Sequence, residues 1–261
     1  MAATLTVRLA AGFAAVAEVA WFGARTLRDG FRRPFEIAEL FRQIFELGSR
    51  SLPLIAAAGF AVGAVLSMHT RASLERFGAE ALIPAGLAMA LFRETGPLVT
   101  GLLFAGRVGA GIGAELGAMR VTEQIDALES LAVDSFKFLV VTRVAACVIV
   151  LPLLTTVMNF TGIIGGFVAE TAISGMSFDL YFDRAFSLID FVDYIPSTVK
   201  TAVFGFIIGV IASWLGYNTK GGSAGVGQAS TRSVVIASIS VIASNVLLVK
   251  LIFFIFPGAA E

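Results

Sequence analysis

The chain has 261 residues, of which 57% are hydrophobic and 15% charged, and its mean hydropathy is +0.88. Soluble domains average about 25% charged residues, so this composition excludes an ordinary soluble domain and indicates an all-α integral membrane protein. The formal net charge of zero gives no basis for nucleic-acid binding. One cysteine and one histidine exclude a disulfide framework and any metal site built from several histidines or cysteines.

The first 50 residues are expected to form an interfacial amphipathic region (1–50). Leu9–Ala24 follows Arg8 as a signal-peptide core would, but Glu18 interrupts it and no cleavage site follows, so we favour an interfacial stretch. A second stretch alternates apolar and polar residues at helical spacing, which indicates an amphipathic helix in the membrane interface. Its apolar residues are Ile37, Leu40, Phe41, Ile44 and Phe45, and its polar residues are Glu36, Glu39, Arg42, Gln43 and Glu46.

Residues 51–261 are expected to form a five-helix membrane domain, because a membrane crossing needs about 20 mainly apolar residues. The predicted spans are about Leu52–Met68, Leu82–Val108, Phe138–Val168, Val199–Tyr217 and Val234–Phe256.

Basic residues are concentrated before the first span, and acidic residues in the connection between the third and fourth. The basic set is Arg8, Arg25, Arg28, Arg32, Arg33, Arg42 and Arg50, and the acidic set is Glu170, Asp179, Asp183, Asp190 and Asp193. The positive-inside rule therefore predicts a cytoplasmic amino end and, after five crossings, an outer carboxyl end. The short loop assigned to Arg71 and Arg76 faces outward and departs from this rule.

Two glycine-rich segments imitate nucleotide-binding motifs. Gly222–Gly227 has phosphate-loop spacing, but Gln228 and Ala229 stand where Lys and Ser/Thr are required, so we expect a flexible cytoplasmic turn. Gly109, Gly111 and Ala114 match a dinucleotide fingerprint but follow a membrane helix rather than a strand. No cofactor is therefore expected in this chain, and any ATP would be used by another subunit.

Small residues recur at four-residue spacing and predict close helix packing, either within one subunit or in a dimer interface. The longest stripe is Gly101, Ala105, Gly109, Gly113 and Gly117, and shorter pairs are Gly59/Gly63, Gly162/Gly166 and Gly205/Gly209.

Arg93 and Glu94 lie inside the second predicted span, where a charge costs roughly 2.5–3.5 kcal/mol on insertion scales. Adjacent helical residues point about 100° apart, so the two cannot simply neutralise each other. Pro97 follows and is expected to bend the helix. We expect either a cavity open to water or lipid headgroups, or a buried pair with partners on other helices. Asn245 is a weaker example of the same kind.

The segment 119–131 is expected to be a short cytoplasmic helix. Val121, Ile125 and Leu128 form an apolar line, and Glu123, Asp126 and Glu129 lie on the exposed side. From the pattern alone, a docking helix and a solvated connector remain equally open.

Three segments closely resemble the MlaE (YrbE) family of ABC transporter permeases: Phe92–Pro97 (FRETGP), Leu103–Gly109 (LFAGRVG) and Ala114–Gln124 (AELGAMRVTEQ). Ala132–Asp134, Arg143, Leu151–Leu154, Ser223–Gly225 and Thr231–Val235 continue the likeness, which extends over the chain after about Phe31.

The resemblance implies a multi-pass permease of the bacterial inner membrane that forms a homodimer. Its implied partners are an ABC ATPase subunit that uses the ATP and an MCE-domain subunit that binds lipid, and its implied substrate is a phospholipid. It implies a substrate site at Arg93, Glu94, Leu66, Leu74 and Phe77. It also implies an ATPase-coupling helix with Arg120, Thr122, Glu123, Gln124, Asp126 and Glu129. Arg71 and Ser73 depart from the more apolar sequence expected there.

Two other classes of protein are considered from the residues. A membrane-embedded lipid-modifying enzyme is the alternative, but the single histidine leaves no Ser/His/Asp set to assemble. A passive channel or scaffold would not need a cytoplasmic docking helix.

Overall fold

The structure is a computed structural model that describes residues 2–33 and 35–255, and the regular structure in this part of the chain is helical. The long helices are α1 (Ala2–Gly30), α2 (Ile37–Leu74), α7 (Thr142–Ser174), α9 (Phe191–Tyr217) and α10 (Gly222–Ile255). Between α2 and α7 lie η1 (Glu75–Phe77), η2 (Glu80–Leu82), α3 (Ile83–Ala90), η3 (Leu91–Thr95), α4 (Gly96–Phe104), η4 (Ala105–Gly109), α5 (Ala110–Val121), α6 (Gln124–Ser130) and η5 (Phe136–Val141). The short α8 (Phe178–Phe186) joins α7 to α9.

Among the described residues, five helices are long and apolar enough to cross a membrane, which confirms the predicted all-α integral membrane protein. They are Ile37–Phe77, Glu80–Val121, Phe136–Ser174, Asp193–Tyr217 and Gly222–Ile252. Each contains or closely matches a predicted span, except that the last residue of the fifth prediction, Phe256, lies outside the described residues.

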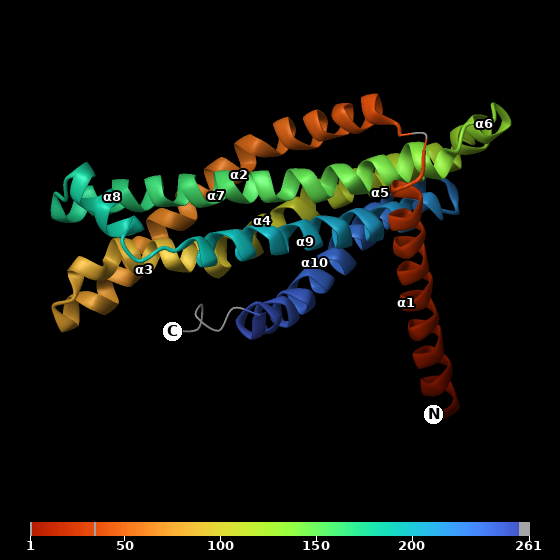
Figure 1. Ribbon diagram of the computed structural model, residues 1–261. Helices are drawn as coiled ribbons and strands as arrows, with labels where there is room; N and C mark the ends of the chain where they lie inside the picture. Colours follow the sequence, from red (N-terminus) through yellow and green to blue (C-terminus); the bar gives the residue numbers. More distant parts are fainter. Residues whose placement is uncertain (1, 34, 256–261) are drawn as a thin grey trace.

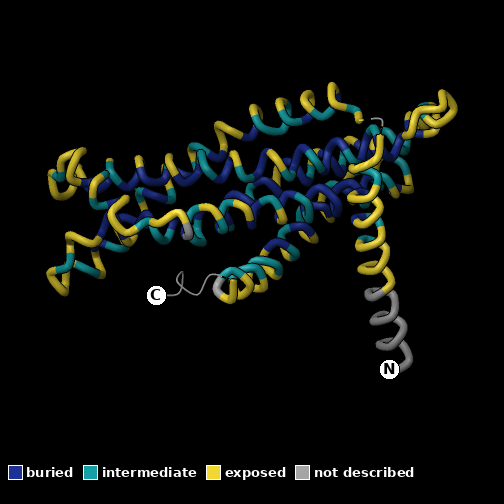
Figure 2. Tube along the Cα trace, viewed as in Figure 1, coloured by how far each residue is buried: buried dark blue, intermediate teal, exposed yellow. Residues whose placement is uncertain are grey.

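The helices form an elongated bundle with α7 near its middle, and α1 projects steeply away from it near one end (Figure 1). Buried residues concentrate along α7, α9 and the second span, whereas residues 14–30 of α1 and the far part of α10 are largely exposed (Figure 2). The main core combines residues of α2, α4, α5, α7, α9 and α10, among them Ile55, Phe104, Leu151 and Phe204. The exposed apolar helix faces are those that a membrane covers.

The amphipathic stretch at 37–50 is continuous with the first span in α2 and turns its polar side toward the protein. Glu39 and Gln43 are buried, whereas Phe41 is 66% and Phe45 75% exposed. This arrangement suits a helix bordered by lipid, because the membrane solvates the apolar side and the protein supplies polar partners to the other.

Glycines allow α2 and α9 to approach α7 closely. A Cβ on Gly63 would overlap the backbone of Gly162, and a Cβ on Gly205 would overlap the backbone of Cys147. The longer stripe packs on α9 and α10, with Gly101 against Phe204 and Val241. These small-residue faces therefore serve packing within one chain, one of the two roles that the sequence left open.

Several connections are more helical than the sequence predicted. Gly222–Gly227, expected to be a flexible turn, opens α10. Arg71 was assigned to a loop and Glu170 to a connection, but they lie inside α2 and α7. Arg71 is paired there with the fully buried Glu170. In each extra turn the backbone N–H and C=O groups are paired in helical hydrogen bonds. Arg71 neutralises the buried carboxylate of Glu170.

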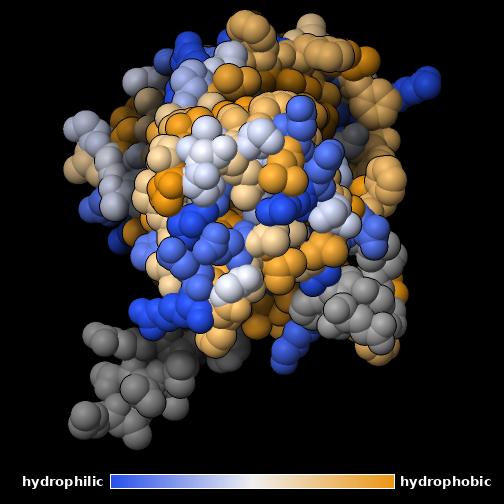
Figure 3. All heavy atoms as spheres, turned by 90° about the vertical axis from the view of Figure 1, so that its left-hand side faces the viewer, coloured by the Kyte–Doolittle hydropathy of each residue, from blue (hydrophilic) through white to orange (hydrophobic). Residues whose placement is uncertain are grey.

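The two ends of the bundle differ in their elements. The short helix α6 lies at one end, together with the start of α2 and the end of α5, and α8 lies at the other with η1 (Figure 1). Seen from the α8 end, hydrophilic and hydrophobic side chains are intermixed over the surface (Figure 3).

Candidate functional site

A break in the second span positions its two charged residues. The segment η3 is π-helical, and the backbone N–H of Gly96 donates to the carbonyl of Leu91, five residues earlier. Pro97 has no N–H, so it cannot donate to the carbonyl of Arg93 four residues before it. The Lys200 ammonium donates to that carbonyl instead, with Nζ 2.8 Å from the oxygen. The proline therefore creates a polar backbone site inside the membrane span, which a side chain of α9 occupies.

Arg93 is paired with an acid on α9. Its Nη2 lies 2.7 Å from Oδ1 of Asp193, and the side chains are 27% and 6% exposed. Asp193 is fixed from the other side, because its Oδ2 accepts a hydrogen bond from the backbone N–H of Asp190 at the start of α9. The guanidinium of Arg93 is thus held in place by Asp193 and remains partly exposed.

Glu94 is held by two further helices. Nζ of Lys200 lies 3.1 Å from its Oε1, and the amide of Asn245 on α10 donates to its Oε2 over 3.2 Å. The Lys200 side chain is only 2% exposed, but Glu94 is 44% exposed. Arg93, Glu94, Asp193, Lys200 and Asn245 are called the charge cluster below, and their four formal charges sum to zero.

These partners agree with a buried pair that is held by other helices, which was one of the two arrangements expected for Arg93 and Glu94; the other was an open polar cavity. The half-exposed Glu94 also agrees with the open cavity, because the cluster retains a polar surface. Zwitterionic groups have the same balance of charges, so the cluster can contact one with no net charge left over.

An apolar pocket lies beside the cluster. It has a volume of 200 Å³ and is lined mainly by aromatic and aliphatic side chains, with Asp190 as its acidic member. Phe92, the neighbour of Arg93, forms one wall and packs edge-on against Tyr194 with ring centroids 5.4 Å apart. A charged edge next to an apolar wall is the general requirement for binding a molecule with a polar head and an apolar tail.

The predicted apolar cavity residues occupy different places. Leu66 packs against the cluster of buried residues that contains Phe92. Leu74 is the last residue of α2 and Phe77 lies in η1, where Phe77 is 83% exposed. Leu66 therefore packs on the same buried core as Phe92, whereas Leu74 and Phe77 belong to the α8 end of the bundle.

The predicted coupling residues surround α6 at the opposite end. Ile125 is fully buried, and Thr122, Glu123, Gln124, Asp126 and Glu129 are exposed. Arg120 is paired with Asp126 at 2.7 Å. Left-handed backbone at Glu123 (φ 60°) and Ala132 (φ 59°) brackets the helix and sets its direction. Arg120, Asp126 and Glu129 thus form a charged outer surface over an apolar anchor.

Glu129 fixes the end of α6 to Ser135 at the start of η5 and to Tyr217 at the end of α9. It accepts hydrogen bonds from Oγ of Ser135 at 2.6 Å and from the hydroxyl of Tyr217 at 3.2 Å. These bonds favour the ionised carboxylate and hold the pKa of Glu129 below its usual value.

Sequence reasoning found Arg93 and Glu94 but not all of their partners. Lys200 is the second residue of the fourth predicted span, and a lysine at the end of a span can reach the membrane interface, so its charge was less conspicuous than that of Arg93. Asp193 was counted only as part of an acidic connection. Among residues 2–33 and 35–255, no three His, Cys, Asp or Glu side chains lie close enough to hold a metal ion.

Comparison with known proteins gives consistent similarities. The model of the family described as "Permease MlaE" matches residues 40–251. A probable ABC transporter permease protein of Rickettsia bellii is 38% identical over 95% of both chains. The intermembrane phospholipid transport system permease protein MlaE of Haemophilus influenzae is 34% identical over 89% of this chain and 88% of its own. The chloroplastic Arabidopsis thaliana protein TRIGALACTOSYLDIACYLGLYCEROL 1 is 32% identical over 84% of this chain and 62% of its own.

Proposed function

Because this chain belongs to the MlaE permease family, we propose that it is the membrane-spanning permease subunit of an ABC transporter that moves phospholipids. A separate ATPase subunit hydrolyses the ATP. The charge cluster is the observation that carries the proposal. Arg93 and Glu94, which lie inside the second span, are partly exposed beside an apolar pocket.

The cluster suits a phospholipid for electrostatic reasons. The guanidinium of Arg93 is held by one acid and remains 27% exposed, so it can donate to a phosphate oxygen. The carboxylate of Glu94 is 44% exposed and can accept from a headgroup ammonium or hydroxyl. Acyl chains need only the apolar surface that the neighbouring helices provide. The cluster therefore contacts the part of the lipid that resists crossing a membrane.

The helix α6 is proposed as the surface that engages the ATPase. Its exposed charges project from the end of the bundle, and Ile125 anchors it on the core. The Arg120–Asp126 pair ties it to α5, and Glu129 ties it to the start of η5 and to α9. A displacement of α6 is therefore transmitted to α9, which carries Asp193 and Lys200. This path links ATP binding to the charge cluster.

The remaining parts of the assembly are proposed from the family resemblance. They are a second copy of this chain and an MCE-domain subunit at the outer end. The assembly lies in the bacterial inner membrane with the amino end of this chain inside. The exposed apolar residues of α10, such as Ile239 (61%) and Leu247 (70%), offer a surface for the second copy. The α6 end is then cytoplasmic, where the arginines of the first 50 residues are concentrated.

Purification of the tagged chain from its native membrane in mild detergent tests this assembly. Mass spectrometry is expected to find an ABC ATPase, an MCE-domain protein and bound phospholipid. Replacing Glu123, Gln124 and Asp126 together by alanine should release the ATPase and leave the lipid, and the same change at Asp179 and Asp183 on α8 serves as the control. Recovery of the chain without an ATPase in several detergents would contradict the proposal.

A further inference from the structure

A second charged cleft lies between α2 and the segment formed by η4 and α5. Its volume is 310 Å³, and its lining includes Arg50, Arg107, Glu46, Glu115 and Ser51. None of the residues of the charge cluster lines it. These residues lie toward the α6 end of α2 and α5, so this cleft and the charge cluster are separate candidate contacts for a lipid.

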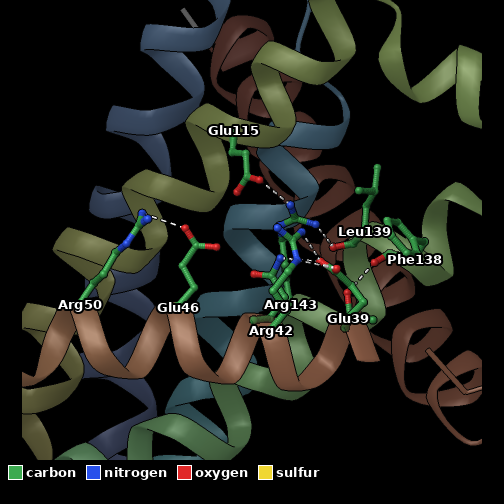
Figure 4. Close-up of polar contacts among 10 residues, drawn as sticks. Glu39, Arg42, Glu46, Arg50, Glu115, Phe138, Leu139 and Arg143 are labelled. Carbon is green, nitrogen blue, oxygen red and sulfur yellow. Dashed lines mark hydrogen bonds and ion pairs between the residues drawn. The ribbon is translucent and has the colours of Figure 1, made fainter. Parts of the chain in front are cut away.

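Two positive and two negative side chains face this cleft. Glu46 and Arg50 point from α2 toward the helix that carries Glu115 (Figure 4). Glu46 and Arg50 are paired at 2.8 Å, with exposed fractions of 36% and 68%. Glu115 contacts the buried Arg143 through its Oε1 at 2.7 Å and is itself 55% exposed. Arg107 has no acidic partner within 4.0 Å among the described residues. The cleft therefore offers an unpaired guanidinium together with two accessible carboxylates.

A hydroxyl in the cleft lining is buried without a hydrogen-bond partner in the described part of the chain. Ser51 is 1% exposed, and its Oγ has no hydrogen-bond partner among the described residues. A buried polar group without a partner is rare, because its desolvation is not compensated. Gly111 widens the cleft, since a Cβ there would meet no other atom within 4 Å. These two features leave room and a donor for a polar ligand.

We propose that this cleft binds the headgroup of a zwitterionic phospholipid that carries a primary ammonium group. Arg107 and Arg50 donate to the phosphodiester, Ser51 donates to a phosphate or ester oxygen, and Glu46 and Glu115 accept from the ammonium. A headgroup with phosphate alone would draw Arg50 away from Glu46 and leave that carboxylate without its counter-charge. The ammonium of a zwitterion replaces this counter-charge, so the pattern of charges selects the zwitterion. The site takes its lipid from the leaflet on the α6 side. As a contact for transported lipid it rests on the proposed function, but binding is measurable without transport.

Photo-crosslinking in nanodiscs tests the site directly. The purified complex is reconstituted with a phosphatidylethanolamine that carries a photoreactive group close to its headgroup, and labelled peptides are mapped by mass spectrometry. Labelling is expected on peptides containing residues 43–51 and 107–115. Arg107→Gln should lower this labelling about tenfold, since it removes a charge-assisted hydrogen bond. Arg76→Gln, which changes an exposed arginine at the α8 end, should leave it unchanged.

Two further measurements test the selectivity. Glu46→Gln should reduce the preference for the ethanolamine lipid over the matching photoreactive phosphatidylglycerol. Soluble glycerophosphoethanolamine should compete with labelling of the unaltered protein, and inorganic phosphate should compete poorly. This competition needs no variant, so it is informative even if Arg107→Gln does not fold.

Equal labelling by the glycerol lipid, full competition by inorganic phosphate, or labelling that is unchanged in a folded Arg107→Gln protein would overturn the inference. These outcomes differ from a failure of the proposed function. If the complex shows no ATP-driven lipid movement, the transport proposal fails, whereas the crosslinking pattern still decides whether the cleft binds the headgroup.

Discussion

The residue that most depends on its partner in the charge cluster is Lys200, because it is almost fully buried and Glu94 is not. Removing the partner of a buried charge destabilises the protein by on the order of 3 kcal/mol. A half-exposed carboxylate that loses its partner is still solvated, and Glu94 also keeps its hydrogen bond from the amide of Asn245. Loss of Glu94, which leaves the buried Lys200 unpaired, therefore costs more stability than loss of Lys200.

Glu94→Gln is expected to lower the thermal unfolding temperature in mild detergent more than Lys200→Met does. The double variant should recover most of the loss, because the buried ammonium is then gone. Lys220→Met, at an exposed lysine, is the control for loss of a lysine charge. A larger loss for Lys200→Met than for Glu94→Gln would contradict this interpretation of the cluster.

Glu129 makes the attachment of α6 dependent on pH. Its pKa is lowered by the hydrogen bonds from Ser135 and Tyr217, so its stabilising contribution is fully present above its usual value of 4.5 and is lost as pH falls through the lowered pKa. At about pH 7 the unaltered protein should therefore unfold at a higher temperature than Glu129→Gln, and the difference should shrink toward about pH 3. Thermal unfolding of both proteins over this range measures the effect. A constant difference would show that the charge of Glu129 plays no part.

At the scale of elements, the contact between α2 and α7 depends on glycines. A Cβ at Gly63 has no room, because it would overlap the backbone of Gly162, and backbone atoms cannot move aside as a flexible side chain can. At Gly86 in α3, by contrast, nothing lies within 4 Å of the added Cβ. The two positions form a matched pair.

Gly63→Ala is expected to destabilise the protein by about 1–3 kcal/mol through overpacking. Gly86→Ala should have no effect or stabilise by up to about 1 kcal/mol, since alanine is the better helix former. Unfolding of both variants in the same detergent measures the contrast. Equal stability of the two variants would show that α2 and α7 adjust freely and that the close approach is not required.

The spans could be predicted from the sequence because each is an apolar run of sufficient length, but the helix boundaries could not. Hydropathy falls where Arg71 and Glu170 occur, yet the helices continue because these residues pair with each other. Likewise, Arg93 and Glu94 were conspicuous as charges in an apolar run, whereas Asp193 became a candidate only when folding brought α9 beside η3. Pairing across helices depends on tertiary structure, which local pattern does not contain.

At the scale of the whole molecule, the structure separates the proposed tasks along the bundle. The outer charges of α6 lie at one end, the charge cluster lies in the second span, and α9 connects them by contacting Glu129 through Tyr217 and by carrying Asp193 and Lys200. The chain belongs to the MlaE permease family, and the contacts of α9 are the proposed route by which a separate ATPase acts on the charge cluster.

The most informative single measurement is ATP-driven movement of labelled phospholipid in proteoliposomes that contain the permease and its co-purified ATPase. The unaltered complex should move lipid only with hydrolysable ATP. Arg93→Ala should assemble normally but transport at least about tenfold more slowly, because its hydrogen bonds to the phosphate are lost. Arg76→Ala should transport normally. Lipid movement that is independent of ATP, or normal transport by an assembled Arg93→Ala complex, would contradict a permease that acts on phospholipid through the charge cluster.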